Sequence, residues 1–232
     1  MSQVLAAECI GKSFRRQRVL SSASLRAVAG ELRVLLGRNG VGKSTLLKIA
    51  AGCLDPDSGS LQFAGRSYLS ARLCGLAAKG LFYLPEYDLF SRSFTVRRQL
   101  QMIRQRFNGR DPEEGAVLMG IDTHLDKRPD QLSGGERRRA ELAAAFVRKP
   151  LCLLADEPYR GLVPLEAERL TSGFAALAAD GVAVVVAGHE VSTLLGAADH
   201  VTWCTSGTTY ELGPPQTAIN NETFRREYLG SA

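Results

Sequence analysis

The sequence lacks any long hydrophobic run. Its longest candidates, Leu151–Ala155 and Val182–Ala187, have the length of a β-strand, whereas a membrane-spanning helix needs roughly 20 apolar residues. The first residues also lack the basic region and apolar core that mark a secretory signal peptide. We therefore expect no membrane span and no secretion signal, and we expect the protein in the cytoplasm.

Cysteine is sparse and scattered. The chain has five cysteines, and none of them form the close pairs that bind zinc. This spacing fits a reducing compartment in which each thiol behaves as a small apolar side chain. The sequence also lacks an internal repeat and a low-complexity segment.

Charge of one sign is not concentrated in a tail. The 29 basic and 24 acidic residues leave a net charge of +5, with short clusters such as Arg137-Arg138-Arg139. A basic balance can favour nucleic acid or anionic lipid, but clusters this short also fit a solvated surface. We expect no nucleic-acid partner. With 45% hydrophobic residues, the composition is that of a soluble globular protein with ample material for a core.

Short apolar runs alternate with helical patterns along the chain. Strands are predicted at 4–10, 19–29, 32–36, 60–64, 80–84, 151–155 and 182–187. Helices are predicted at 43–51, 96–107, 136–148 and 165–179. This alternation predicts an α/β fold with a mostly parallel sheet covered on both faces, with an antiparallel β region at the sheet's edge.

Residues 86–149 interrupt this alternation. They begin with a segment rich in Arg and Gln, in which Val96, Leu100, Ile103 and Phe107 have helical spacing. We expect a small helical subdomain here, inserted into an α/β core made of residues 1–85 and 150–232. The whole chain, 1–232, is then a single domain.

A glycine-rich segment follows one predicted strand and opens a predicted helix. It reads Gly37-Arg38-Asn39-Gly40-Val41-Gly42-Lys43-Ser44, with the spacing and context of a phosphate-binding loop. The glycines let backbone N–H groups close around phosphates, and the helix N-terminus adds positive charge. Lys43 can bind the β- and γ-phosphates, the Ser44 hydroxyl is placed for Mg²⁺, and Thr45 can donate to the α-phosphate. The loop alone predicts a nucleoside triphosphate site.

Two carboxylates, Asp156 and Glu157, end a later apolar strand. Side chains at the carboxyl end of a parallel strand face the crevice where ligands bind. Asp156 would hold Mg²⁺ through water, and Glu157 would polarise an attacking water. An acidic pair before a proline is common in any protein, and the phosphate loop upstream is what favours the catalytic interpretation.

A second glycine motif, Leu132-Ser133-Gly134-Gly135-Glu136, stands at a predicted helix start. Ser133, Gly134 and Gly135 offer a hydroxyl, exposed N–H groups and the helix dipole to an anion. Ser133 and Glu136 also form the pattern of a capping box. The two interpretations are compatible, because a capped helix start can still receive a phosphate.

In this order, the motifs resemble the ATP-binding cassette (ABC) family along nearly the whole chain. The resemblance identifies 37–44 as its Walker A loop, 151–157 as its Walker B strand with the catalytic glutamate, and 132–136 as its signature. It implies a P-loop NTPase-type fold, with His189 as the switch histidine at the γ-phosphate and Phe14 as the aromatic beneath the adenine. A single His or Phe is more often a packing residue, so both roles depend on the order of the motifs.

The resemblance implies ATP hydrolysis with Mg²⁺ by two cassettes arranged head to tail. Each ATP would lie between the Walker A loop of one subunit and Ser133–Gly135 of the other, the second subunit being a copy or a paralogue. Arg138 or its neighbours would lie near that interface or on a solvated helix face. The same resemblance implies a separate integral membrane permease that docks around Leu89–Phe94, placing the protein at the inner face of the cell membrane.

The segment 223–230 resembles the ending of cassettes for lipopolysaccharide export and branched-chain amino-acid import, although it also fits a plain amphipathic terminal helix.

Two residues depart from the family pattern. Glu86 stands where the family usually has Gln, so it keeps an oxygen ligand for Mg²⁺ but adds a negative charge and loses the amide donor. Val163 stands where an Asp usually reaches across the dimer. These departures leave open a degenerate structural cassette that binds ATP with little turnover. A non-transport ABC ATPase is a second alternative that stays open.

Overall fold

The computed structural model describes residues 2–15, 17–189 and 194–230. Its described strands join into one sheet in the order β5-β4-β1-β2-β10-β9-β3-β8-β7-β6. They are β1 (Gln3–Phe14), β2 (Gln17–Val28), β3 (Leu32–Leu36), β4 (Ser58–Phe63), β5 (Arg66–Tyr68), β6 (Leu81–Leu84), β7 (Cys152–Asp156), β8 (Ala183–Gly188), β9 (His200–Thr205) and β10 (Thr208–Gly213). The predicted α/β class is confirmed.

Helices connect these strands and cover them. They are α1 (Lys43–Ala50), α2 (Leu73–Ala78), α3 (Val96–Phe107), α4 (Pro112–Leu118), α5 (Gly134–Arg148), α6 (Pro164–Ala179), α8 (Pro215–Ile219) and α9 (Glu222–Phe224). Short 3₁₀ turns lie at Asp122–His124 and Pro129–Gln131, and a π-helical turn at Arg225–Leu229 follows α9. None of the helices in the described ranges is both long and apolar enough to span a membrane.

The parallel half of the sheet is buried on both faces. β3 lies between β8 and β9, and β7 and β6 follow β8, with every one of these pairs parallel. Successive side chains of a strand point to opposite faces. Val34 and Leu36 therefore join one buried cluster while Leu35 joins the other. This explains why the strand sequence is apolar throughout instead of alternating.

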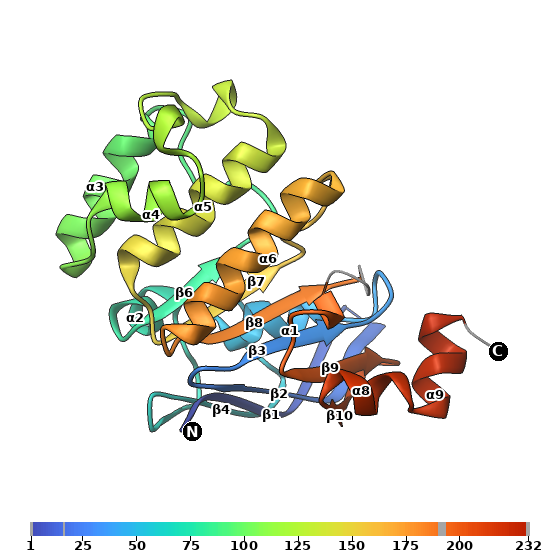
Figure 1. Ribbon diagram of the computed structural model, residues 1–232. Coiled ribbons are helices and arrows are strands. Elements are labelled where there is room, and N and C mark those ends of the chain that lie inside the picture. The colour runs from blue at the N-terminus through green and yellow to red at the C-terminus, as the bar shows by residue number, and fades with distance from the viewer. Residues whose placement is uncertain (1, 16, 190–193, 231–232) are drawn as a thin grey trace.

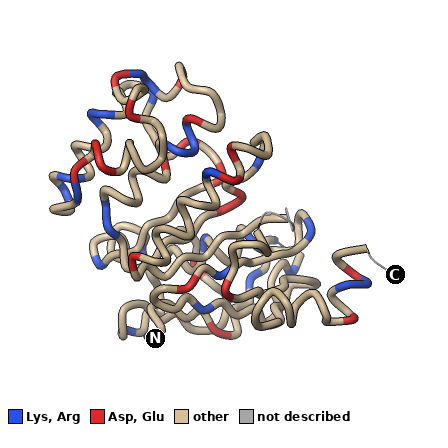
Figure 2. The backbone as a smooth tube through the Cα atoms, viewed as in Figure 1, with Lys and Arg blue, Asp and Glu red and all other residues tan. Residues whose placement is uncertain are grey.

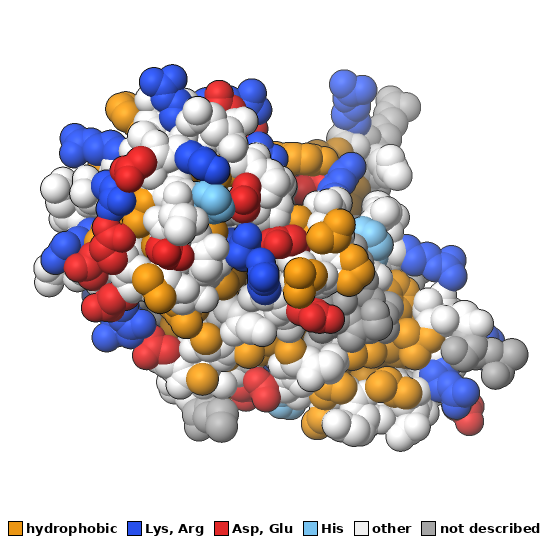
Figure 3. Space-filling view, turned by 45° about the horizontal axis from the view of Figure 1, so that its top comes forward, with side chains coloured by type: hydrophobic (Ala, Val, Ile, Leu, Met, Phe, Trp, Pro, Cys, Tyr) orange, Lys and Arg blue, Asp and Glu red, His pale blue; other side chains and the backbone are white. Residues whose placement is uncertain are grey.

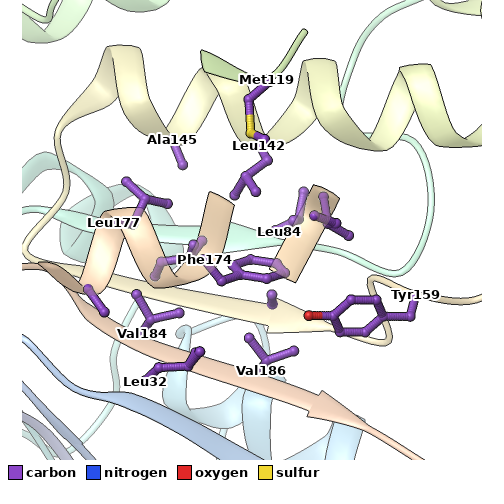
Figure 4. Packing of buried hydrophobic residues seen from close by; sticks show 14 of the residues in the cluster. Leu32, Leu84, Met119, Leu142, Ala145, Tyr159, Phe174, Leu177, Val184 and Val186 are labelled. Atoms are coloured by element: carbon purple, nitrogen blue, oxygen red, sulfur yellow. The ribbon is translucent and has the colours of Figure 1, made fainter. Parts of the chain in front are cut away.

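One helical layer lies on each face. α6 packs Leu170, Phe174 and Leu177 into the cluster that contains Val184 and Val186, and α5 packs over α6 (Figure 4). On the opposite face, α1 and α2 supply the second cluster, together with residues of β1 and β2. The two layers fix the ends of the parallel strands relative to one another, which is what a site built from strand ends requires.

The antiparallel region contains β1, β2, β4 and β5. β1 runs to Phe14, although the sequence predicts a strand only at residues 4–10. The register of β1 against β2 shifts between Ala7 and Ile10, where Cys9 has a positive φ of 52°. This bulge lets the strand continue past Gly11, and it has no clear signal in the apolar pattern.

Helices α3, α4 and α5 gather at one end of the molecule, away from β1, β2 and β4 (Figure 1). They come from the segment between β6 and β7. Division of the chain into residues 86–149 and a core of 1–85 and 150–232 stays a prediction. Basic and acidic residues are interspersed over the helical end of the molecule (Figure 2). The space-filling view shows both signs of charge mixed on this part of the surface (Figure 3).

Candidate nucleotide site

Four predicted site residues follow neighbouring parallel strands. Lys43 comes after β3, His189 after β8, Glu157 after β7 and Glu86 after β6. These strands lie side by side in that order, so their carboxyl ends meet at one edge of the sheet. A cavity of about 500 Å³ opens there. It is lined by Val19, Asn39, Gly40, Gly42, Lys43, Ser44, Thr45, Glu86, Glu157, Arg160 and His189.

The glycines of the phosphate loop are required by its shape. Gly42 caps α1 in the left-handed region, at a φ of 110°, and a Cβ there would lie 2.6 Å from Leu20. At Gly37 a Cβ would overlap the carbonyl oxygen of Cys204. Only glycine fits both positions without displacing the loop. The loop therefore leads directly into the N-terminus of α1, where backbone N–H groups are available to an anion.

Lys43 is only 4% exposed and is fully engaged within the loop. Its Nζ donates to the carbonyl oxygens of Gly37 at 2.8 Å and Arg38 at 3.2 Å. It also forms an ion pair of 3.1 Å with Oε1 of Glu157. A buried ammonium needs such partners. The lysine is thus held at the cavity wall by groups that a phosphate can replace.

Ser44 lines the cavity and contacts the buried carboxylate of Asp156. The Ser44 hydroxyl donates to Oδ1 of Asp156 at 2.8 Å, and the Tyr83 hydroxyl donates to Oδ2 at 3.1 Å. Burial raises the pKa of Asp156 above its ordinary value, although both hydrogen bonds work in the opposite direction. The sequence does not single out Tyr83, because its contact depends on the pairing of β6 with β7.

The donors at Ser44 and Asp156 fit magnesium. A hydroxyl and a carboxylate supply the hard oxygen ligands that this ion prefers. The described residues contain no group of three or more His, Cys, Asp or Glu side chains able to hold a metal by themselves. The fit therefore depends on phosphate and water for the remaining ligands, which is usual for Mg²⁺ at nucleotide sites.

Glu157 connects Lys43 to His189. Its Oε1 pairs with Lys43, and its Oε2 lies 2.9 Å from Nδ1 of His189. The Glu157 backbone has a φ of 46°, an uncommon conformation for a residue other than glycine, and its N–H donates to the carbonyl oxygen of Ala187 at 3.0 Å. Strained backbone of this kind is frequent at functional sites. Residue Glu190, next to His189, lies outside the described residues.

Glu86 lines the cavity, but its carboxylate is engaged by Arg160 in an ion pair. Partial burial works to raise the pKa of Glu86, yet hydrogen bonds from Arg160 and Tyr87 bring it below its ordinary value. A metal ion would have to replace Arg160 to gain this carboxylate, so the expectation that Glu86 binds Mg²⁺ stays a prediction. No motif in the sequence singles out Arg160.

Several predicted residues do not line the cavity. Arg38 points toward the C-terminal turn and donates to the carbonyl oxygen of Glu227 at 2.6 Å, while the carbonyl oxygen of Val41 contacts the Cys204 thiol. Phe14, at the end of β1, is 45% exposed, with its ring centroid 5.8 Å from Nζ of Lys12. Its place beneath an adenine stays a prediction.

The second glycine motif also stands outside this cavity. Ser133 caps α5: its Oγ accepts from the N–H of Glu136 at 3.2 Å, and Oε2 of Glu136 accepts from the N–H of Ser133 at 2.8 Å. The capping box is therefore formed. A Cβ at Gly134 would meet open space, whereas one at Gly135 would overlap Glu166. The helix start thus keeps an open face to solvent at Gly134.

Arg138 is buried, so it is not on the solvated helix face that the sequence allows. Its guanidinium donates to the carbonyl oxygen of Pro85 at 2.8 Å and to that of Glu86, and it pairs with Glu141 at 2.7 Å. The sequence of α5 does not predict the contacts with Pro85 and Glu86, because these partners lie in another segment. Arg138 joins the helix of the second glycine motif to the loop that carries Glu86.

Comparison with known proteins gives one consistent result. A family model described as ABC transporter matches residues 20–160. The lipopolysaccharide export system ATP-binding protein LptB of Acidithiobacillus ferridurans is 30% identical over 99% of this chain and 98% of its own length. An uncharacterised ABC transporter ATP-binding protein of Rhizobium meliloti is 32% identical over 97% of this chain and 86% of its own length. The ADP conformation of an ATP-binding cassette of an ABC transporter superposes with a TM-score of 0.86, at 21% identity and full coverage of both chains.

Proposed function

Because this chain belongs to the ABC transporter family, in which it is an ATP-binding subunit with ATPase activity, we propose that the cavity at Lys43 and Glu157 is its hydrolytic site. The contacts from Lys43 through Glu157 to His189 carry this proposal. They place a cation for phosphate, a carboxylate for water and an imidazole within one cavity. The reaction is ATP and water to ADP and phosphate.

Each residue of the cavity has a distinct task. The loop N–H groups and Lys43 bind the phosphates, with Lys43 exchanging the carbonyl oxygens of Gly37 and Arg38 for phosphate oxygens. Glu157 polarises a water for attack on the γ-phosphorus. As the new P–O bond forms, Glu157 takes a proton from the attacking water, the bond to the bridging β,γ-oxygen breaks, and ADP leaves with that electron pair. His189 holds the Glu157 carboxylate and faces the γ-phosphate.

Ser44 and Asp156 are the residues that would hold magnesium, and the ion would neutralise phosphate charge during this step.

The cavity is half of the complete site. Ser133, Gly134 and Gly135 do not line it, yet their helix start remains open to solvent at Gly134. We propose that a second cassette, a copy or a paralogue, supplies these residues to the phosphates in a head-to-tail dimer. ATP then binds the two subunits together, and its hydrolysis releases them. This two-state change is what can drive a partner.

An apolar groove beside α3 supports a permease partner. It is a cavity of about 400 Å³ between the α2–β6 segment and α3, lined mainly by apolar side chains that include Leu89, Phe90 and Phe94. Phe94 is 45% exposed, whereas Phe90 is buried. We propose that a segment of an integral membrane permease docks here, at the inner face of the cell membrane. Phe94→Ala is therefore a cleaner test of docking than Phe90→Ala.

The likeness to LptB, which is named as one component of an export system, also supports a cassette that works with separate subunits.

The Val163 departure bears on the structural-cassette alternative. Val163 stands at the N-cap of α6 without a side-chain capping bond and is 62% exposed. It offers no carboxylate to a second subunit. The machinery at Lys43, Glu157 and His189 is nevertheless assembled, which favours an active site over a purely structural one.

Phosphate release by the purified protein, alone and with its permease, tests the proposed function. We expect Glu157→Gln to lower turnover by at least about 100-fold with ATP still bound, since general base catalysis is lost. Lys43→Ala should lose ATP binding itself. If wild type and Glu157→Gln release phosphate at the same low rate while both bind ATP, the structural-cassette alternative is favoured.

A further inference from the structure

The loops after β6 and β7 are joined by a side-chain pair at the rim of the nucleotide cavity. The carboxylate of Glu86, after β6, pairs with the guanidinium of Arg160, after β7, and both side chains line the cavity. The two strands are parallel neighbours, with Leu84 opposite Ala155. The pair therefore lies directly across the gap between two adjacent loops.

Both ends of the pair are held in place. The backbone carbonyl of Glu86 accepts from Arg138 of α5, so the peptide that carries this carboxylate is fixed from the helical side. The N–H of Arg160 donates to the carbonyl oxygen of Glu157 at 3.3 Å, and its guanidinium lies 5.4 Å from the ring centroid of Tyr87. The ion pair thus connects fixed segments rather than two free surface side chains.

The balance of charge in the cavity indicates what the ion pair between Glu86 and Arg160 does. Glu157 is matched by Lys43, and the buried carboxylate of Asp156 accepts hydrogen bonds from Ser44 and Tyr83. Among the described residues that line the cavity, Glu86 is the remaining carboxylate, and Arg160 is its ionic partner. An unpaired carboxylate facing a triphosphate repels it, and at a site this open the repulsion is moderated but not removed by solvent.

We propose that Arg160 is a positioning residue of the nucleotide site, which neutralises Glu86 and keeps its carboxylate engaged so that this charge does not oppose ATP. The inference rests on the proposed nucleotide site. Arg160 acts through Glu86 and needs no contact with ATP. The same pair withholds Glu86 from a metal ion, so Ser44 and Asp156 remain the protein's donors to it.

Binding of ATP in the presence of EDTA tests this without any contribution from metal. With a fluorescent ATP analogue at low salt, we expect Arg160→Ala to weaken binding roughly three- to tenfold, the size of one exposed charge interaction near phosphates. Arg160→Lys should recover part of the loss because it restores the charge. The double variant Glu86→Gln with Arg160→Ala should bind about as tightly as wild type, since the unpaired carboxylate is then gone.

Two other substitutions separate the possible outcomes. Arg26→Ala breaks another exposed ion pair, with Glu8 in the β1–β2 region, and should leave ATP affinity unchanged. Lys43→Ala should abolish binding; if it binds as wild type does, the proposed site itself is wrong. If wild type binds, Lys43→Ala does not, and the double variant stays as weak as Arg160→Ala, then Arg160 acts directly on the nucleotide and the proposal is overturned. Unchanged affinity in Arg160→Ala overturns it equally.

Discussion

If the proposed nucleotide site is correct, the contacts of Lys43 must change when ATP binds. Its ammonium is buried and held by two loop carbonyl oxygens and by the Glu157 carboxylate. Charge-assisted contacts of this kind are stronger than those between neutral groups. A phosphate that takes this lysine therefore competes with Glu157. We therefore expect this ion pair to stabilise the empty site and to weaken its affinity for ATP.

Neutralising Glu157 should strengthen binding of metal-free ATP. In Glu157→Gln the amide no longer forms an ion pair with Lys43, so the lysine is released to the phosphates. We expect roughly three- to tenfold tighter binding in EDTA, together with a lower melting temperature of the empty protein, because a largely buried pair has lost one partner. Titration with a fluorescent ATP analogue and thermal unfolding measure the two effects.

A surface acid separates this effect from the loss of one negative charge. Glu113→Gln removes a carboxylate that pairs with Arg97 on the surface, outside the nucleotide cavity. It should alter neither the ATP affinity nor the melting temperature of the empty protein appreciably. Equal tightening in both variants would show that net charge, and not the contact with Lys43, sets the affinity.

Motifs that are local in the sequence could be predicted residue by residue. Lys43, Ser44 and Glu157 belong to segments whose spacing carries their chemistry, and all of them lie at the cavity or its base. Arg160 and Tyr83 could not be identified in this way. Their contacts exist because β6 lies beside β7, and strand order is not written in either segment. The sequence offers one signal for Arg160. Glu86 is an acid where the family usually has Gln, and its negative charge favours a basic partner nearby.

At the scale of elements, the packing of α5 against α6 depends on Gly173. A Cβ at this position of α6 would lie 2.8 Å from Cδ2 of Leu142 and 2.8 Å from Cε of Met119. Figure 4 shows Met119 and Leu142 close together above Phe174 of α6. Protein cores are close-packed, so such an overlap forces a shift of side chains or backbone.

Gly173→Ala should therefore destabilise the protein. Overpacking a core costs about 1–3 kcal/mol, which exceeds the gain of roughly 0.5–1 kcal/mol that alanine brings to a helix interior. Equilibrium unfolding in urea should show a lower midpoint at an unchanged slope.

The chain offers a matched control in another helix. Gly75 of α2 is exposed, and a Cβ there would meet nothing within 4 Å. Gly75→Ala should stabilise the protein by roughly 0.5–1 kcal/mol, because only the helix propensity changes. If both variants were stabilised, the α5–α6 contact would be more adaptable than the close packing at Gly173 indicates.

Local sequence patterns predict whether a segment is a helix or a strand, but they do not always predict the residue at which it begins or ends. Helix α3 has the bounds expected from its apolar spacing, and α5 begins directly after its cap Ser133, two residues before the predicted start at Glu136. The capping box is a local signal and locates this end better than the apolar pattern does. The far end of β1 depends on a bulge at Cys9, which only pairing with β2 defines.

At the scale of the whole molecule, the sheet order could not be derived from the sequence. β3 lies in the interior of the sheet because it pairs on its two sides with β8 and β9, which come from much later in the chain. β10 likewise pairs with β2, although nearly the full sequence separates them. Long-range pairings of this kind are not specified by either strand alone. They nevertheless decide which loops meet, and so they assemble Lys43, Glu157 and His189 while leaving Ser133–Gly135 outside.

This separation gives the head-to-tail dimer a complementation test. Lys43→Ala disables the phosphate loop of its own subunit, and Gly134→Asp places a negative charge at the second glycine motif without a clash inside its own subunit, since a Cβ there meets open space. In a head-to-tail dimer of the two variants, one site holds both defects and the other holds neither. Two inactive proteins should therefore restore activity when they are mixed.

The expected size of the recovery follows from the symmetry. With free exchange of equal amounts, half of the dimers are mixed and each has one intact site of two, so about a quarter of wild-type phosphate release should return. Each variant measured alone serves as the control and should stay inactive. If mixing restores nothing although the subunits exchange, either both sites of a dimer must be intact or each subunit completes its own site. Recovery of activity on mixing requires the crossed arrangement of Lys43 and Gly134, because each site would keep one defect if every subunit completed its own site.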